Sequence, residues 1–171
     1  MTRCAISGLI ISYCIQMKKL YILLCFCSFF VIPRVVLAEL ETGKWNFVLE
    51  NEYCYIGSFP IKEKIPEGKK RGDTYILVYR MNKSPDAIVQ INAGYPYDEK
   101  KSVEVKIDSS IYNFFSKEDS AWTNEDKKVI YAMKKGIKLI VKGYSSRGTP
   151  TTDTYTLKGF TAAYNKLAKG C

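Results

Sequence analysis

The chain of 171 residues contains no histidine. Without an imidazole, Ser-His-Asp and Cys-His catalysis and the commonest zinc ligand are excluded. The phosphate-binding patterns GxGxxG and GxxxxGK[ST] are also absent. Acidic residues are missing from the first part of the chain, where Glu39 is the first one. No set of residues meets the requirements of an active site, so we predict no catalytic residue, no metal site and no cofactor.

The first 38 residues have the three-part plan of a secretory signal peptide. Two lysines precede an apolar run over residues 20–32, and Val36 and Ala38 occupy the small-residue positions of a cleavage site. The run is shorter than the ~20 apolar residues of a membrane span. We expect cleavage after Ala38 and a periplasmic or secreted protein. An uncleaved anchor is the alternative, and Met17 is an alternative start.

Residues 39–171 are predicted to form a single domain without a transmembrane segment. Removal of residues 1–38 takes away four basic residues and no acidic one, which lowers the formal charge from +9 to +5. This mildly basic charge is compatible with contact with acidic lipid head groups or polyanions. No nucleic-acid-binding signature accompanies it, so the expected partner is a protein or another envelope component.

Two of the six cysteines, Cys54 and Cys171, remain after removal of the leader. An even pair in an exported chain favours a disulfide bond, and two free thiols are the alternative. A bridge across so long a loop would stabilise the fold by ~4–5 kcal/mol in the chain-entropy model.

Eight segments have the β-branched and aromatic composition of short strands. They cover residues 44–49, 53–59, 74–81, 87–95, 102–108, 111–115, 137–144 and 153–157. Capping residues, end charges and terminal glycines predict helices over residues 123–136 and 159–170. The predicted fold class is mainly β: a β-sandwich-like domain of about eight short strands with two short helices, the second at the C-terminus.

A hydroxyl-rich stretch, SSRGTPTTDTYTLKGF, begins at residue 145. Without a histidine its hydroxyls have no imidazole base, so a nucleophilic role loses its usual support. We interpret residues 145–152 as a hairpin tip in which Gly148 and Pro150 shape the turn. The chain then returns as a strand and enters the last helix.

Two charged residues flank this predicted tip. We expect Arg147 and Asp153 to pair across the hairpin, while Tyr155 and Leu157 face the core. If Arg147 instead points into a cleft, the hairpin becomes the best candidate ligand site in the chain.

The tripeptide Arg71-Gly72-Asp73 matches an integrin-binding sequence. We interpret it as a structural turn in which Gly72 supplies backbone freedom, with adhesion as the alternative. It ends a polar loop over residues 61–73. The basic part of that loop, from Lys62 to Arg71, is interpreted as a solvated tip, with a polyanion site as the alternative.

Four tyrosines are candidates for a surface row that binds sugar or nucleic acid by stacking. They are Tyr53, Tyr55, Tyr95 and Tyr97. Core packing is the competing explanation for aromatic residues that alternate with polar ones along strands.

Segments spread from the first strand to the last residue carry a family pattern. They are Trp45, CYIGSFP (54–60), KKRGDTYILV (69–78), INAGYPY (91–97), SAW (120–122), AMKKG (132–136), VKGYSSRGTPTTDTYTLKGFTAAYNKL (141–167) and Cys171. Together they resemble the invasion-associated locus B family of alphaproteobacterial exported proteins. The resemblance implies an exported β-sandwich-like domain and pairing of Cys54 with Cys171. It also implies an association with host-cell invasion or envelope biology, and no enzymatic activity. Pro150 departs from the pattern.

We therefore predict an exported, non-enzymatic binding or envelope protein. The alternatives are an envelope-structural protein with no small ligand, and a histidine-independent hydrolase that uses carboxylates or hydroxyls. A deep carboxylate-lined pocket would favour the hydrolase, and a basic or aromatic surface would favour a partner or polyanion. The candidate ligand or partner contacts are Arg71, Asp73, Arg147 and Asp153.

Overall fold

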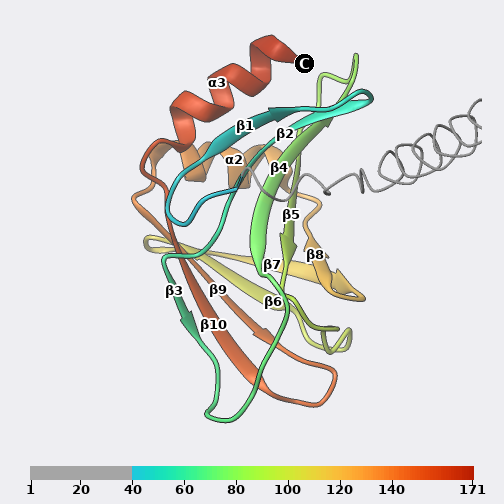
Figure 1. The fold of residues 1–171 in the computed structure, drawn as a ribbon, viewed down its shortest axis with the longest axis vertical. Helices are drawn as coiled ribbons and strands as arrows, with labels where there is room; N and C mark the ends of the chain where they lie inside the picture. Colours follow the sequence, from blue (N-terminus) through green and yellow to red (C-terminus); the bar gives the residue numbers. More distant parts are fainter. Residues whose placement is uncertain (1–39) are drawn as a thin grey trace, which may run out of the picture. The chain divides into compact units, whose positions relative to one another are not determined.

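A computed structural model describes residues 40–171 of the chain, drawn as a ribbon in Figure 1. The predicted signal peptide over residues 1–38, its cleavage after Ala38 and the alternative start at Met17 lie outside the described residues. The described strands are β1 (Asn46–Leu49), β2 (Tyr53–Ser58), β3 (Lys62–Lys64), β4 (Tyr75–Met81), β5 (Ile88–Asn92), β6 (Val103–Ile107), β7 (Ser110–Lys117), β8 (Ser120–Trp122), β9 (Lys138–Tyr144) and β10 (Pro150–Thr156). The described helices are α2 (Asp126–Lys135) and α3 (Phe160–Gly170).

The ten described strands form one antiparallel sheet in the order β1-β2-β4-β5-β8-β7-β6-β9-β10-β3. The sheet curls, and β7 joins its two halves because its first part pairs with β6 and its last part with β8. A strand that runs through two halves of a folded sheet is a standard way to turn the corner of a sandwich. The mainly β prediction, with two helices and the second at the C-terminus, is confirmed.

Two of the ten strands are absent from the predicted set. β3 is the charged tripeptide Lys-Glu-Lys within the predicted loop over residues 61–73, and it pairs with β10. β8 has three residues and follows a tight turn at Glu118, whose φ is 56°. Tertiary pairing, rather than local composition, makes both segments extended.

Alternating apolar residues from both halves of the sheet form the main core. In β6, Val103, Val105 and Ile107 are buried between half-exposed charged residues. From α3, Phe160 and Leu167 are fully buried in the same cluster. Burial of such a side chain contributes about 1.5–3 kcal/mol.

Helix α2 buries the predicted stripe of Val129, Ile130 and Met133. The predicted cap at residues 123 or 124 is wrong by one to two positions, because the residue before the helix is Glu125 and its side chain makes no capping bond. The Thr123 hydroxyl instead accepts a hydrogen bond from the Glu125 N–H at 3.1 Å. No helix within residues 40–171 is long and apolar enough to cross a membrane.

The Cys54–Cys171 disulfide joins β2 to the end of α3, with the two Cα atoms 5.9 Å apart. It confirms the favoured prediction over two free thiols. A second tie runs from Trp45, whose Nε1 donates to the Thr156 carbonyl at 2.9 Å and whose ring packs edge-on against Phe160. Both ends of the described chain are therefore fastened to the sheet.

Candidate functional site

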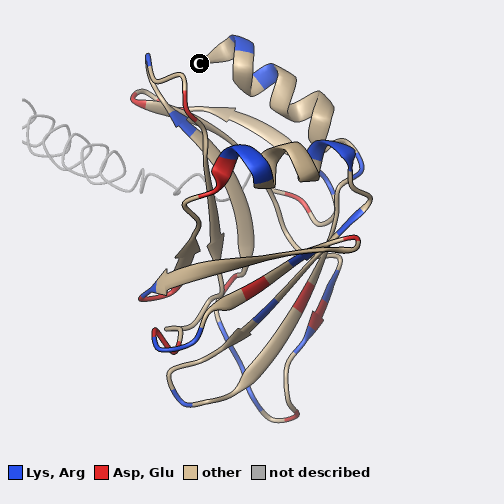
Figure 2. Ribbon diagram, turned by 180° about the vertical axis from the view of Figure 1, so that it is seen from behind, with Lys and Arg blue, Asp and Glu red and all other residues tan. Residues whose placement is uncertain are grey.

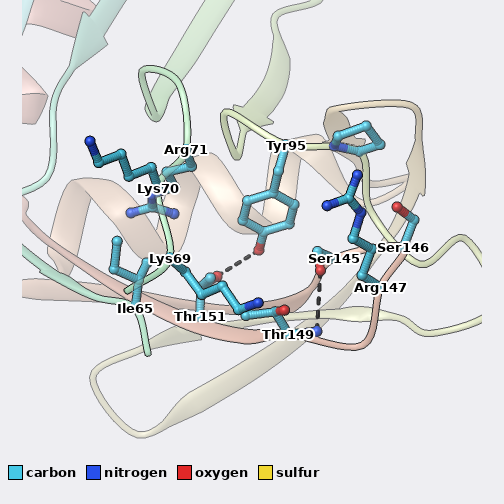
Figure 3. A pocket seen from close by; sticks show the side chains of 11 residues that line it. Ile65, Lys69, Lys70, Arg71, Tyr95, Ser145, Ser146, Arg147, Thr149 and Thr151 are labelled. Atoms are coloured by element: carbon cyan, nitrogen blue, oxygen red, sulfur yellow. Dashed lines mark hydrogen bonds between the residues drawn. The ribbon is translucent and has the colours of Figure 1, made fainter. Parts of the chain in front are cut away.

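A pocket of about 230 Å³ lies between the loop that precedes β4 and the tip of the β9–β10 hairpin. Figure 3 shows its side chains converging from these two segments and from the chain after β5. The lining residues are basic, hydroxyl-bearing or apolar: Ile65, Lys69, Lys70, Arg71, Tyr95, Pro96, Ser145, Ser146, Arg147, Thr149 and Thr151. No carboxylate occurs among them.

The hairpin tip is held by backbone and hydroxyl bonds across residues 145–149. The Gly148 N–H donates to the Ser145 carbonyl at 2.7 Å, and Gly148 has a φ of +77°, which favours glycine. The Ser145 hydroxyl accepts from the Thr149 N–H at 3.1 Å. The predicted role of Gly148 in the turn is confirmed. Pro150 lies outside the tip because it pairs with Tyr144 as the first residue of β10.

The predicted pair of Arg147 and Asp153 is wrong. Asp153 is in the middle of β10 and shares the buried face of the strand with Thr151 and Tyr155. Its carboxylate meets the guanidinium of Arg71, with Nη1 to Oδ2 at 2.8 Å and Nη2 against Oδ1. Because β10 starts three residues earlier than predicted, Asp153 points inward and away from the tip.

Arg71 is a buried cation in the pocket lining, and its charge is already matched by two carboxylates. Its side chain is 4% exposed, and Nη2 donates to Glu63 Oε2 at 2.7 Å in addition to the contact with Asp153. Burial lowers the pKa of the Arg71 guanidinium, but hydrogen bonds to these two carboxylates outweigh it and hold the pKa above its ordinary value. Burial raises the pKa of the Asp153 carboxyl, and Arg71 opposes that rise. Arginine stays protonated in proteins, so Arg71 remains a cation.

The Arg71-Gly72-Asp73 tripeptide crosses another chain segment closely. The Gly72 N–H donates to the Gly94 carbonyl at 2.9 Å. A Cβ at Gly94 would lie 2.2 Å from the Gly72 oxygen, and Gly94 has a φ of +69°. Gly94, rather than Gly72, therefore supplies the unusual backbone geometry. Of the tripeptide, Arg71 lines the pocket, while the exposed Asp73 lies outside it.

Three other cations on the pocket wall have no ion pair with any described residue. They are Lys69, Lys70 and Arg147. In Figure 3 the Arg147 guanidinium lies on the same side of the hairpin as the Tyr95 ring. Arg147 therefore lines a pocket instead of pairing across the hairpin, which is the condition under which the hairpin becomes the candidate ligand site. From the sequence, Lys69 and Lys70 are predicted only as part of a basic loop and are not named as contacts.

Tyr95 forms the aromatic wall of the pocket. Its hydroxyl is 2.5 Å from the Thr151 hydroxyl, and its ring packs at 5.3 Å, edge to face, on Tyr97. Burial raises the pKa of the Tyr95 phenol. The predicted surface row of four tyrosines is wrong, because Tyr55 and Tyr97 are buried at 6% and 4% exposure. Inward and outward side chains alternate along β10, so Thr151 shares the inward face with Asp153. This alternation is the sequence signal that could have predicted Thr151 beside the pocket.

The chemistry available in the pocket is binding of negative charge. Cationic groups and hydroxyls can donate several hydrogen bonds to one anion. The lining contains neither histidine nor a carboxylate, and the Ser145 and Thr151 hydroxyls are engaged in bonds that hold the walls. Within the described part of the chain, no group of three His, Cys, Asp or Glu side chains is placed to hold a metal ion.

Comparisons with known proteins agree with the fold and the sequence pattern. The family model described as "Invasion associated locus B (IalB) protein" matches residues 61–168, more than half of the chain. The crystal structure of invasion associated protein B from Bartonella henselae is similar with a TM-score of 0.54 at 16% identity. That similarity covers 75% of this chain and 94% of the Bartonella chain. The comparison with curated proteins finds no match. The chain belongs to the invasion associated locus B family.

Proposed function

We propose that this protein is an exported envelope protein that acts by binding rather than catalysis, and that the pocket beside Arg147 receives an anionic group of its ligand. The observation that supports this most directly is the set of three cations without ion-pair partners among the described residues. They stand on a wall that also carries five hydroxyls, those of Tyr95, Ser145, Ser146, Thr149 and Thr151.

Electrostatics favour an anion at this position. The buried carboxylate of Asp153 and the half-exposed carboxylate of Glu63 both pair with Arg71, so they do not neutralise the outer cations. Like charges that converge on one pocket repel one another, and a bound anion removes that repulsion. Hydrogen bonds to a charged group contribute about 1.5–3 kcal/mol each.

The size of the pocket limits what it can enclose. A drug-sized ligand needs ~300–1,000 Å³, and this pocket has about 230 Å³. The pocket therefore suits a small anion or the charged end of a larger molecule. Hydroxyls and a tyrosine ring beside the cations favour a ligand that also carries sugar-like hydroxyls.

Export is supported by the leader pattern and by the disulfide. A bridge between Cys54 and Cys171 needs an oxidising compartment to form and persist. We expect the N-terminal sequence of the mature protein to begin at Glu39. A start at any other residue would contradict cleavage after Ala38.

A part in host-cell invasion is proposed by analogy with the Bartonella protein, whose name refers to invasion. The test compares host-cell entry by the wild type, by a deletion strain, and by the deletion strain that carries either the wild-type protein or the Arg147→Gln variant. Equal entry by the deletion strain and the wild type would contradict the invasion role while leaving the binding proposal intact.

The binding proposal is tested by titration with inorganic phosphate and with glucuronate, followed by amide NMR. We expect saturable shifts at Gly148, Thr149 and Thr151. Of the two anions, the one that binds more tightly is expected to lose at least about tenfold in affinity in Arg147→Gln. Lys166→Gln on α3 removes one charge far from the pocket and is the matched control. Absence of saturable shifts with both anions would contradict the proposal.

A further inference from the structure

The outward side of β3, β10, β9 and β6 carries lysines around a line of threonines. In β10, Thr152, Thr154 and Thr156 alternate with the buried Asp153 and Tyr155, so the threonines point to the side opposite the pocket. We call this surface the Lys/Thr face. Its members are Lys62, Lys64, Lys106, Lys138, Lys142, Thr152, Thr154 and Thr156.

The strand register places lysines on both sides of the threonine line. On β3, Lys62 is opposite Thr154 and Lys64 is opposite Thr152. On β9, Lys142 is opposite Thr152 and Lys138 is opposite Thr156. Directly opposed residues of an antiparallel pair share one face of the sheet. One strand further, Lys106 lies opposite Ile140 on the same face.

Charges of opposite sign are separated across this half of the sheet. Glu63 lies between the two lysines of β3 and pairs with Arg71 on the inner side, as Asp153 does on β10. On the Lys/Thr face the strand register adds one acidic residue, Glu104, which pairs with Lys142 at 2.9 Å. The other four lysines have no ion pair with a described residue.

Protection of a sheet edge explains only part of this pattern. Lysines on an edge strand prevent unwanted strand pairing, which accounts for Lys62 and Lys64 on β3. Lys106, Lys138 and Lys142 lie on β6 and β9, which are paired on both sides. In Figures 1 and 2 both helices lie at the opposite end of the described domain from β3. Figure 2 shows basic positions on these neighbouring strands.

We infer that the Lys/Thr face binds an extended anionic polysaccharide. Residues two apart on a strand are ~6.6 Å apart and neighbouring strands are ~4.8 Å apart, so the lysines form a flat array of positive charge. The threonine hydroxyls in its centre donate to and accept from sugar hydroxyls. A membrane surface fits less well, because its interface favours tryptophan and tyrosine. Among the outward residues of these four strands only Tyr144, at the end of β9, is aromatic, and Lys101 lies over its ring.

This site is separate from the pocket, since the two lie on opposite sides of β10.

The test uses protein produced from the full-length chain and measures binding to dextran sulfate and to neutral dextran over a range of NaCl concentrations. We expect binding to dextran sulfate alone, with affinity that falls steeply as salt rises, as for other polyanions.

Two triple variants separate the face from overall charge. Lys62→Gln with Lys64→Gln and Lys138→Gln is expected to weaken dextran sulfate binding at least about tenfold and to flatten the salt dependence. The control is the same substitution at Lys117, Lys166 and Lys169, which removes equal charge elsewhere and should change affinity less than about threefold. An equal loss in both triple variants would overturn the inference.

A further variant and a second probe distinguish sugar from lipid. Thr154→Val keeps the side-chain shape but removes a hydroxyl, and we expect weaker binding to dextran sulfate. Binding to phosphatidylglycerol vesicles at concentrations where dextran sulfate does not bind would overturn the polysaccharide assignment. The triple variant at Lys62, Lys64 and Lys138 should leave the glucuronate-induced shift at Gly148 unchanged, so the pocket and the face can fail independently.

Discussion

The guanidinium of Arg71 meets both carboxylate oxygens of Asp153, although the two residues are 82 positions apart in the chain. Both side chains are 4% exposed. This contact fastens the loop before β4 to the inner face of β10 and so fixes one wall of the pocket. It also uses the carboxylate that was predicted to pair with Arg147, which leaves Arg147 on the pocket wall without an ion pair to a described residue.

Asp153→Asn is expected to destabilise the fold by about 3 kcal/mol, because it leaves a buried guanidinium with the half-exposed Glu63 as its only charged partner among the described residues. The midpoint of urea unfolding measures this. Arg71→Met combined with Asp153→Leu removes both charges and should cost less than Asp153→Asn alone. Glu41→Gln, which breaks an exposed pair with Lys44, is the control and should leave the midpoint nearly unchanged. A similar midpoint for wild type and Asp153→Asn would contradict a structural role for the pair.

The disulfide is expected to be complete in the isolated protein. Thiol titration of the denatured, unreduced mature protein should detect no free thiol. Cys54→Ala with Cys171→Ala should lower the free energy of unfolding by about 2–5 kcal/mol, because the bridge closes a loop with a sequence separation of 117. Two free thiols per molecule in the unreduced sample would contradict this prediction.

Stability is expected to fall in alkali because of two buried phenols. Burial raises the pKa of Tyr97 and of Tyr155 above the ordinary value near 10. The folded protein keeps both neutral at a pH where the unfolded chain releases the protons. Their contribution is therefore fully present below pH ~10 and is lost as the pH rises above that value.

Tyrosinate absorbance and circular dichroism, recorded together against pH, test this behaviour. The last tyrosines should ionise only as the fold is lost, and Tyr97→Phe with Tyr155→Phe should move the alkaline transition upward. Ionisation of every tyrosine while the native circular dichroism persists is the result that would rule it out.

The Arg71-Gly72-Asp73 tripeptide is expected to have no adhesive role. An integrin ligand presents its arginine, and here the Arg71 side chain is buried against Asp153 and Glu63. Asp73→Glu should fold normally and leave host-cell adhesion unchanged. A variant that folds normally and loses adhesion would refute this.

Local patterns in the sequence predicted eight of the ten described strands and both helices, because apolar alternation and capping residues act over short distances. β3 was missed since its Lys-Glu-Lys sequence is extended only through pairing with β10. The pocket was predicted only in part. Arg147 was named as the conditional candidate, whereas the Arg71–Asp153 contact depends on a separation that no local spacing reveals.

The most direct test of binding at the pocket is the titration of wild type and Arg147→Gln with inorganic phosphate and glucuronate, observed at the Gly148 and Thr149 amides. We predict saturable shifts in the wild type, at least about tenfold weaker binding in Arg147→Gln, and no change in Lys166→Gln. Shifts that do not saturate, or equal affinities in wild type and Arg147→Gln, would contradict an anion site at the hairpin tip.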